Sequence, residues 1–425
     1  MLMRRSLLIL SLLLCLLLAG CGMGPARTPE EAVSAEAAVE TPEPTPEPSP
    51  TPTPEPLRDE NGDLRFPDGS VYHGYEISIT LSDVTVKTLQ RTIDLLHEMP
   101  NLHTVDLGAK EDGHVTVAIV KRLQRECPDV CFVFRFPLWG VEVCTTDTAL
   151  DLKYIQMDDR GAAVIRALEI MPDCRYLDMD TCGVSSDDMG RIREMFPNVE
   201  VVWRIWFGKE FSVRTDVERI IATNHLTDAN SKDLKYCTKV RLLDVGHNPD
   251  LTDISFLTDM TDLECCILAI MPFRDLTPLT NCTKMEYLEL CEVQYHPDQV
   301  LDLSPLWGMK HLRHLNICKL YEVENYEFLE DCKELERLWI GKYTYIPSDY
   351  IDHLKEVLPD TEINWWTQVC VTEDWREKPK GIFVERYAYL REQFDYKHYE
   401  RSTSYWWNDP LCLGNQPVEG ETKTK

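Results

Sequence analysis

One apolar pattern, in which Leu or a similar residue recurs at the spacing x-x-L-x-L, is repeated along the second half of this 425-residue chain. Its copies begin at residues 240, 263, 285, 312 and 335, so they are spaced by 23, 22, 27 and 23 residues. Each copy is typical of a short strand whose alternate apolar side chains point to one side. A unit this short cannot bury its own apolar face, whereas stacked copies can bury a continuous core. The spacing therefore predicts a solenoid of parallel strands over residues 225–345.

A second motif lies between the copies of the first. It occurs as DISFL at 253–257, DLTPL at 275–279 and DLSPL at 302–306, with a weaker copy, NYEFL, at 325–329. The Asp and Ser or Thr side chains can accept hydrogen bonds from the free N–H groups at the start of a helical turn. Proline is tolerated at the first helical position, where its missing N–H loses no bond. The motif predicts one short helical turn between successive strands.

Together the two motifs resemble the leucine-rich repeat family, and specifically its short bacterial, internalin-like class. The resemblance covers residues 225–345. The 27-residue unit, with its insertion around 295–297, and the lack of the usual Asn after the strand depart from the family pattern. The resemblance implies an α/β leucine-rich repeat solenoid. It also implies that alternate strand residues face outward on a concave side, where such repeats usually bind a protein partner.

Residues 57–224 contain two longer, degenerate copies of a related plan. The segments 99–107 and 171–179 match at an offset of 72 residues. Each is followed by a helical pattern, the first over 117–127 and the second after Ser185, a residue type that caps helix N-termini, and then by a strand. These patterns predict α-helices on the outer side of both copies.

The C-terminal region begins with a third helix-and-strand copy at 351–365. Residues 346–410 as a whole predict a terminal repeat and a C-terminal cap, because the open end of a repeat array must be covered and this region is rich in aromatic residues. Residues 411–425 are expected to form a disordered tail.

The first 56 residues carry a different kind of signal. Arg4 and Arg5 precede an apolar run that ends in Leu18-Ala19-Gly20-Cys21, a motif that resembles the bacterial lipobox. The resemblance implies that residues 1–20 are a signal peptide and that Cys21 is lipidated. Residues 21–56 are rich in Pro and Glu, which favours an extended, disordered stalk. We therefore expect a lipid-anchored protein on the extracellular face of the bacterial cytoplasmic membrane.

The charge of the chain restricts its partners. It has 72 acidic and 44 basic residues, and hence a formal net charge of −28. Nucleic acids and anionic lipid surfaces are bound through Lys and Arg, so neither is expected as a partner. The sequence contains no catalytic or phosphate-binding motif and no C-x-x-C pair. We accordingly expect a monomer with no enzyme activity, no cofactor and no metal site.

The sixteen cysteines at first suggest a disulfide scaffold. However, Cys237, Cys282 and Cys332 lie three residues before the first apolar residue of a strand, and Met260 and Met309 occupy the same position in other repeats. Interchange with Met indicates a buried apolar position. We therefore interpret most of the cysteines as packed thiols.

The outward strand residues supply the candidate binding site. Tyr, Trp and Arg are the residue types that most often dominate the energy of protein interfaces, and they gather on the later strands of the array. The predicted ligand-binding patch on the concave side consists of Tyr287, Glu289, His314, Asn316, Arg337 and Trp339.

Three alternatives stay open at this point. The patch could be an ordinary solvated face. The aromatic residues of the C-terminal region could instead form a cell-wall or glycan-binding module, in which rings stack on sugars or peptides. The chain could also be a surface enzyme whose site no motif reveals.

Overall fold

The computed structural model describes residues 56–110, 113–207, 211–293 and 300–368, together with 370, 375, 377–378, 382–383, 390 and 392–393. Residues Met1–Glu55 form a unit separate from Pro56–Lys425. The predicted signal peptide, the lipidation site at Cys21, the stalk up to residue 55 and the tail at 411–425 all lie outside the described residues. The repeats and the candidate binding residues all belong to the second unit.

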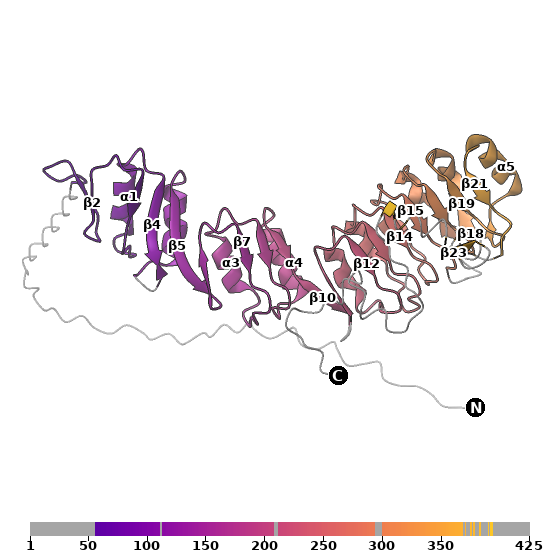
Figure 1. The fold of residues 1–425 in the computed structure, drawn as a ribbon, viewed down its shortest axis with the longest axis horizontal. Helices are drawn as coiled ribbons and strands as arrows, with labels where there is room; N and C mark the ends of the chain where they lie inside the picture. Colours follow the sequence, from indigo (N-terminus) through magenta and orange to yellow (C-terminus); the bar gives the residue numbers. More distant parts are fainter. Residues whose placement is uncertain are drawn as a thin grey trace, which may run out of the picture. The chain divides into compact units, whose positions relative to one another are not determined.

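The predicted repeats form one sheet of seven parallel strands, which lie side by side in Figure 1. Adjacent strands align at the predicted repeat spacing, with Leu243 opposite Cys266 and Leu288 opposite Leu315. This register confirms the α/β leucine-rich repeat solenoid. In sheet order the strands are β12 (Arg219–Ile221), β13 (Leu242–Asp244), β14 (Cys265–Ile267), β15 (Tyr287–Glu289), β17 (His314–Asn316), β19 (Arg337–Trp339) and β21 (Glu362–Asn364).

Each strand has two differently surrounded sides. The middle residues, such as Leu288 and Leu315, pack in the main hydrophobic core. The first and third residues point to the opposite side, as strand geometry requires. We call the surface formed by these first and third residues the concave face. Several of its apolar members, including Cys265, Ile267 and Trp339, belong to a second, separate cluster of buried residues.

Short helices line the far side of this core. The Asp of each predicted half-repeat motif caps its turn: Asp253, Asp275 and Asp302 each accept a hydrogen bond from the N–H two residues later, at 2.8 to 2.9 Å. The turns are 3-10 helices, and α5 (Ser348–Val357) closes the series with the predicted helix. The 3-10 helices are η2 (Ser231–Tyr236), η3 (Ser255–Asp259), η4 (Thr277–Leu279), η5 (Ser304–Gly308) and η6 (Tyr326–Asp331). The short parallel strands β16 (Leu301–Asp302), β18 (Tyr321–Glu324) and β20 (Thr344–Tyr345) run beside them.

The two longer copies form sheets of their own, with α-helices as predicted. Ser185 caps α4 by accepting a hydrogen bond from the Asp188 N–H at 3.2 Å. The first sheet is β3 (Ser78–Thr80), β4 (Thr104–Ala109), β5 (Cys131–Leu138) and β6 (Val141–Cys144), with helices α1 (Leu89–His97) and α2 (Val117–Glu126). The second is β7 (Ala149–Asp151), β8 (Tyr176–Asp178) and β9 (Glu200–Val202), with α3 (Ala162–Leu168) and α4 (Ser186–Met195).

Both longer copies end in an antiparallel hairpin. In the first, β5 pairs with β6; in the second, β10 (Arg204–Phe207) pairs with β11 (Phe211–Arg214). Thr145 and Thr215 close the two hairpins in the same way. The Thr145 hydroxyl accepts a hydrogen bond from the Phe134 N–H, and the Thr215 hydroxyl accepts one from the Trp203 N–H. The remaining strands are the pairs β1 (Leu64–Arg65) with β2 (Val71–Tyr72) and β22 (Glu377–Lys378) with β23 (Ile382–Phe383).

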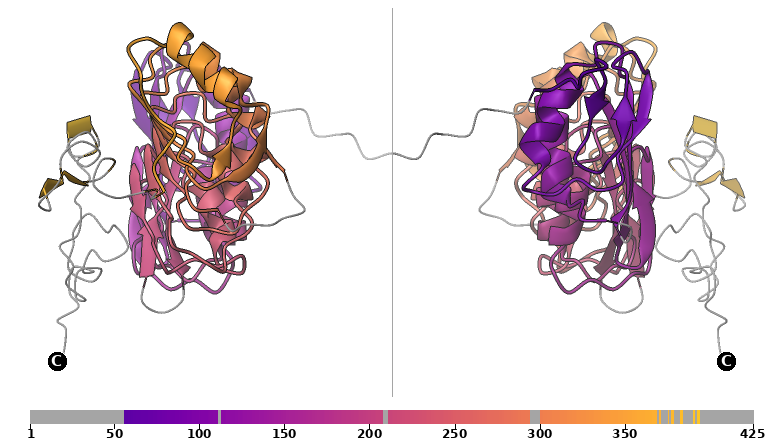
Figure 2. Two further views of the ribbon diagram at one scale, coloured as in Figure 1. Left: turned by 90° about the vertical axis from the view of Figure 1, so that its right-hand side faces the viewer. Right: turned by 90° about the vertical axis from the view of Figure 1, so that its left-hand side faces the viewer.

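The end-on views separate the two layers. Figure 2 shows the strands along one wall and the helices along the other, with β22 and β23 on the strand side. All thirteen cysteines in the described part of the chain are free thiols, and Cys237, Cys282 and Cys332 are buried in the main core as predicted. None of the described helices is long and apolar enough to cross a membrane.

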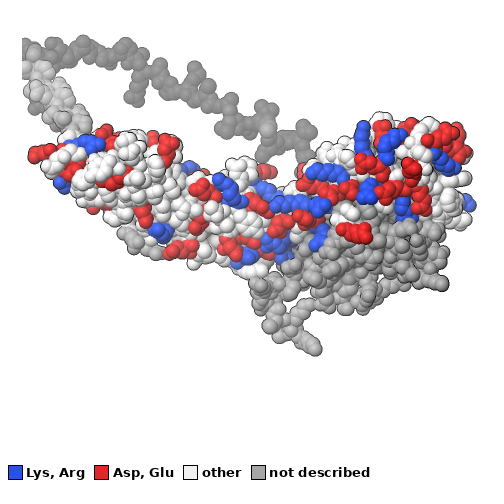
Figure 3. Space-filling model, turned by 45° about the horizontal axis from the view of Figure 1, so that its top comes forward, with Lys and Arg blue, Asp and Glu red and all other residues white. Residues whose placement is uncertain are grey.

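Charged side chains connect successive repeats. Figure 3 shows acidic and basic groups interspersed over one face of the molecule. Pairs such as Arg241 with Glu264, at 2.6 Å, and Lys319 with Glu292, at 2.7 Å, join one repeat to the next. Partly exposed pairs of this kind remain in contact with water and contribute little each. The array is therefore held together mainly by its apolar core.

Candidate functional site

The six predicted binding residues lie together on the concave face, on the neighbouring strands β15, β17 and β19. Their side chains point away from the main core, as expected, but they are not solvated. The exposed fractions run from 0% for Tyr287, Glu289 and Asn316 to 6% for Arg337. The cause is a contact that the repeat pattern does not predict: residues of the C-terminal segment, Cys370 and Trp375, lie on this part of the sheet.

Trp375 is the centre of that contact. Its indole Nε1 donates a hydrogen bond of 2.6 Å to Glu289 Oε1, across 86 residues of sequence. Its ring centroid lies 5.4 Å from that of Trp339 and 6.0 Å from that of Tyr287. The Arg337 guanidinium lies 4.9 Å from the same ring centroid, a cation–π contact. Trp375 is completely buried as a result.

The backbone of the C-terminal segment is bound as well. Asn316 Nδ2 donates to the carbonyl of Cys370 at 2.8 Å, and Arg337 Nη1 donates to the carbonyl of Trp375 at 3.5 Å. The Asn316 amide is itself oriented, because its Oδ1 accepts the Cys318 N–H at 3.0 Å. Arg337 is held from the other side by Glu362, 3.1 Å from its Nε. These groups can thus recognise a polypeptide backbone and an indole side chain together.

Glu289 and His314 complete the polar lining. Glu289 accepts hydrogen bonds from the Tyr287 hydroxyl and from Trp375 Nε1, so its buried carboxylate has two donors. Burial, with smaller contributions from Arg337 and Arg313, lowers the pKa of His314 to about 3. His314 is therefore neutral at pH 7, and its ring lies edge-on to Trp375 at a centroid distance of 6.4 Å.

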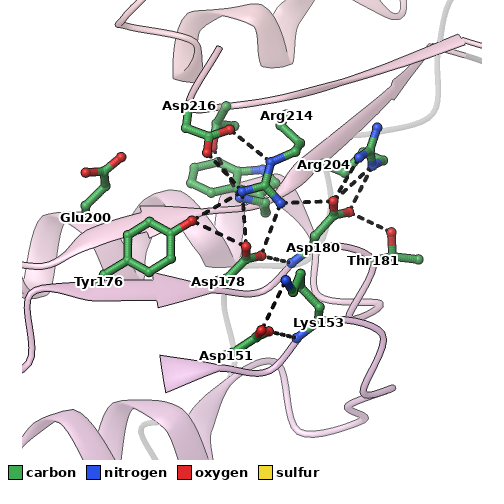
Figure 4. Close-up of polar contacts among 12 residues, drawn as sticks. Asp151, Lys153, Tyr176, Asp178, Asp180, Thr181, Glu200, Arg204, Arg214 and Asp216 are labelled. Atoms are coloured by element: carbon green, nitrogen blue, oxygen red, sulfur yellow. Dashed lines mark hydrogen bonds and ion pairs between the residues drawn. The ribbon is translucent and has the colours of Figure 1, made fainter. Parts of the chain in front are cut away.

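A second polar cluster lies on the concave side of the second longer copy and is drawn in Figure 4. Arg204 binds Asp180 in bidentate fashion, with two N–O distances of 2.9 Å. Arg214 reaches Asp178, Asp180 and Asp216 at 2.9 to 3.2 Å. Asp180 is only 1% exposed, so both arginines of the hairpin compensate a carboxylate that the sheet buries. The cluster therefore fastens hairpin β10–β11 to strand β8.

The protonation of this cluster follows from its hydrogen bonds. Burial alone raises the pKa of Asp180, but hydrogen bonds from Arg204 and Thr181 outweigh it and hold the pKa below the usual value of 3.8. Burial likewise lowers the pKa of Arg214, yet hydrogen bonds to Asp216 and Asp178 leave that pKa above its usual value. Asp180 and Arg214 are thus both charged at neutral pH.

The aromatic residues of the C-terminal region divide between two surroundings. Trp375 is buried, as predicted for a ring of the cap, although it packs on the concave face. Trp365 and Trp366, just after β21, are 39% and 63% exposed. The side chains of the remaining aromatic residues of 383–407 lie outside the described residues. Among the residues that the structure describes, no group of three His, Cys, Asp or Glu side chains is placed to hold a metal ion.

Sequence reasoning did not predict that Cys370 and Trp375 lie on the concave face. One signal could have found them: the outward positions of the later repeats include Leu242, Cys265 and Ile267, which are apolar where a solvated face needs polar groups. Such a line of apolar residues requires a covering segment. The aromatic-rich residues that follow the last repeat are the nearest available cover.

Comparison with known proteins gives similarity in structure alone. No family model matches the chain, and no curated protein matches it. An internalin from Listeria monocytogenes has 14% identity and a TM-score of 0.31, over 70% of this chain and 81% of that one. A leucine-rich repeat protein from Leptospira interrogans has 11% identity and a TM-score of 0.23, over 67% and 93%.

A plant receptor kinase ectodomain from Arabidopsis thaliana, solved in complex with CASPARIAN STRIP INTEGRITY FACTOR 2, has 13% identity and a TM-score of 0.30, over 68% of this chain and 35% of that one. At these identities the similarity concerns the fold and nothing further. The register of the seven parallel strands itself gives this chain the α/β leucine-rich repeat fold.

Proposed function

We propose that this chain is a non-enzymatic bacterial surface lipoprotein that binds a protein partner through the concave face of its repeats. The observation that supports it is the set of side-chain contacts that buries Trp375 on the concave face, and we call the surface made by these side chains the recess. Of the six side chains chosen from the sequence as a binding patch, five contact one indole, and Asn316 and Arg337 hydrogen-bond two backbone carbonyls beside it. A buried aromatic anchor with flanking backbone bonds is how many interfaces hold a polypeptide segment.

In this proposal the chain's own Cys370 and Trp375 are the resident occupants of the recess. A partner binds by presenting an extended segment with an indole or a similar N–H-bearing ring, which replaces Trp375. The acidic acceptor Glu289 selects a ring that donates a hydrogen bond, because an unpaired buried carboxylate is costly. Asn316 and Arg337 donate to backbone carbonyls, which every residue has, so these two contacts do not restrict the sequence around that ring.

The binding test uses the ectodomain, residues 22–425, and a labelled synthetic peptide of residues 368–378 with Cys370→Ser. The Trp375→Ala ectodomain is expected to bind this peptide on the order of tenfold more tightly than the unaltered one. In the unaltered ectodomain Trp375 already occupies the recess for most of the time, and this occupancy lowers the apparent affinity for the peptide. Adding Glu289→Gln and Arg337→Ala should remove the binding. A peptide that also carries Trp375→Ala serves as the control. Failure of the Trp375→Ala ectodomain to bind the peptide would contradict the proposal.

The surface location rests on residues 1–56 and is tested separately. Expressed in a bacterium with its own leader, the chain should partition into the membrane fraction and carry a lipid on Cys21, detected by mass spectrometry of the N-terminal peptide. The Cys21→Ser variant should lose the lipid. An unlipidated protein beginning elsewhere than residue 21 would refute the lipoprotein assignment.

A glycan-binding function is the second candidate, and the exposed pair Trp365 and Trp366 favours it. Their rings lie nearly perpendicular, at 85°, with centroids 6.4 Å apart. Lys355 lies over the Trp365 ring at 5.3 Å. Binding of the ectodomain to insoluble cell-wall glycan that is lost on Trp366→Ala and kept on Trp375→Ala would favour this candidate.

A further inference from the structure

Three thiols from distant parts of the chain meet on the concave face. Cys291 lies two residues after β15, Cys318 lies two residues after β17, and Cys370 belongs to the C-terminal segment. All three are completely buried and free. The three cysteines belong to the same small cluster of buried residues, and Asn316 joins two of them by accepting the Cys318 N–H at 3.0 Å and donating to the Cys370 carbonyl at 2.8 Å.

The repeat register places two of these thiols side by side. Strands β15 and β17 align Glu289 with Asn316, so positions 291 and 318 are equivalent in successive repeats. The Glu292 N–H donates to the Cys318 carbonyl at 3.0 Å, which continues the ladder past the strands. Neighbouring strands lie about 4.8 Å apart, so the two thiols can both face one incoming sulfur.

The same line of positions is small in the other repeats. Ala269 precedes Cys291, and Gly341 follows Cys318. A Cβ atom on Gly341 would lie only 2.4 Å from Cys318 Sγ, so the Cys318 thiol fills the space beside this glycine. The core residues Cys237, Cys282 and Cys332 share their position with Met, whereas Cys291 and Cys318 occupy a position on the opposite side of the sheet, where Cys370 docks.

Cys370 is held in place through its backbone. Asn316 Nδ2 donates to its carbonyl at 2.8 Å, and Trp375, five residues later, is anchored by Glu289. The thiol is therefore presented to Cys291 and Cys318 by contacts that do not involve sulfur. This arrangement brings together the reactants of a disulfide before any bond forms.

We propose that Cys370 forms a disulfide with Cys291 or Cys318 and thereby locks the C-terminal segment onto the concave face. The oxidant is an external disulfide, either a small-molecule disulfide or the oxidised pair of a thiol oxidoreductase. The Cys370 thiolate attacks it, forms a mixed disulfide and releases one thiol. The second cysteine then attacks the Cys370 sulfur and releases the other thiol. Two protein thiols are oxidised, one disulfide is reduced to two thiols, and their protons pass to the released thiols.

The lock regulates access to the recess. In the reduced protein non-covalent contacts hold the C-terminal segment, so a partner can replace it in the recess. The disulfide ties the segment to the sheet and prevents this replacement. The neighbouring thiols of Cys291 and Cys318, and then burial, raise the pKa of Cys370, so the first step takes place while the segment is undocked and the thiol is exposed. The regulatory role rests on the proposed function, while the disulfide itself does not.

The test uses the full ectodomain under native conditions. It is incubated with oxidised glutathione, alkylated with N-ethylmaleimide and digested with trypsin without reduction. Lys310 and Arg313 separate Cys291 from Cys318, and Lys342 and Lys355 separate Cys318 from Cys370, so each cysteine falls on its own peptide. The expected product joins the Cys370 peptide to that of Cys291 or Cys318, with the loss of two hydrogens.

Variants keep the test decisive. Cys370→Ser should abolish the cross-link, and Cys282→Ser, at a buried position of the main core, should leave it intact. The single variants Cys291→Ser and Cys318→Ser should each still cross-link through the remaining thiol, and the double variant should not. Oxidation that leaves Cys370 alkylated, or that joins it to other cysteines, would overturn the proposal.

Peptide binding distinguishes this proposal from the proposed function. If both the proposed function and the disulfide lock are right, the peptide of residues 368–378 binds the reduced Trp375→Ala ectodomain and fails to bind the oxidised one. A cross-link without peptide binding in either state would leave the disulfide standing and refute the proposed function. Peptide binding that is unaffected by the cross-link would refute the regulatory role.

Discussion

The Trp375→Ala variant is expected to expose the concave face of strands β15, β17 and β19. Removing a fully buried Trp costs about 3–5 kcal/mol. Here the loss includes the hydrogen bond to Glu289 and the ring contacts with Tyr287 and Trp339. Since these contacts hold the C-terminal segment and not the core, the effect should be local opening of that segment.

Native thiol labelling measures this opening directly. Cys291 and Cys318 are buried under the segment, so their alkylation requires it to leave the sheet. Because each 1.4 kcal/mol is a tenfold change, their labelling should accelerate on the order of a hundredfold or more in Trp375→Ala. Cys131 is exposed and provides the reference rate within the same molecule.

Trp366→Ala is the matched control, because this Trp is 63% exposed and makes few contacts to lose. Its labelling rates should equal those of the unaltered ectodomain. Equal rates in Trp375→Ala would mean that the segment is held by contacts other than the indole.

The Asp180→Ala variant is expected to destabilise the second longer copy by about 3–5 kcal/mol. The substitution leaves Arg204, whose side chain is only 6% exposed, without the carboxylate that it binds through two hydrogen bonds. Removing one partner of a buried ion pair costs more than the pair contributes, since a buried charge is left uncompensated. Urea unfolding followed by tryptophan fluorescence, to which Trp203 beside this hairpin contributes, measures the effect.

Two further variants define the cause. Asp151→Ala removes a carboxylate that is 65% exposed and paired with Lys153, and should cost less than about 1 kcal/mol. The double change Asp180→Leu with Arg204→Met replaces the pair by apolar groups and should recover much of the loss. If the double variant were as unstable as Asp180→Ala, the uncompensated charge would not be the cause.

Acid provides an independent check on the same cluster. The pKa of Asp180 is lower in the folded chain than its usual value of 3.8, so folding favours the ionised form. Its contribution to stability is complete above pH 3.8 and is lost as the pH falls through the folded value. The difference in stability between the unaltered ectodomain and Asp180→Ala should therefore shrink below pH 3.8.

Strand register and helical turns were predictable because they depend on local periodicity. Leu288 and Leu315 pack inward since each belongs to a repeated pattern, and Asp275 caps its turn through a bond spanning two residues. The outward columns follow from the same register. Sequence reasoning could thus gather Tyr287, Glu289, His314, Asn316, Arg337 and Trp339 on one surface.

The cover over that surface was not predictable in the same way. Trp375 meets Glu289 across 86 residues, and the segment that carries it has no repeat to fix its position. The partners of Asp180 were equally hidden, because Arg204 and Arg214 lie on a hairpin that leaves the parallel pattern. Contacts made by non-repeating segments depend on three-dimensional packing, which periodicity does not encode.

The two hairpins that end the longer copies have a mechanical consequence. In a stacked array each repeat leans on its neighbour, so that fraying at one edge spreads along the ladder of strands. In each hairpin a strand pairs with the strand that follows it in the chain, β5 with β6 and β10 with β11, so the parallel ladder of that copy does not continue into the next sheet. A chain tethered at one end and pulled at the other would therefore yield in stages, one sheet at a time. The sheets not yet under load would keep their structure.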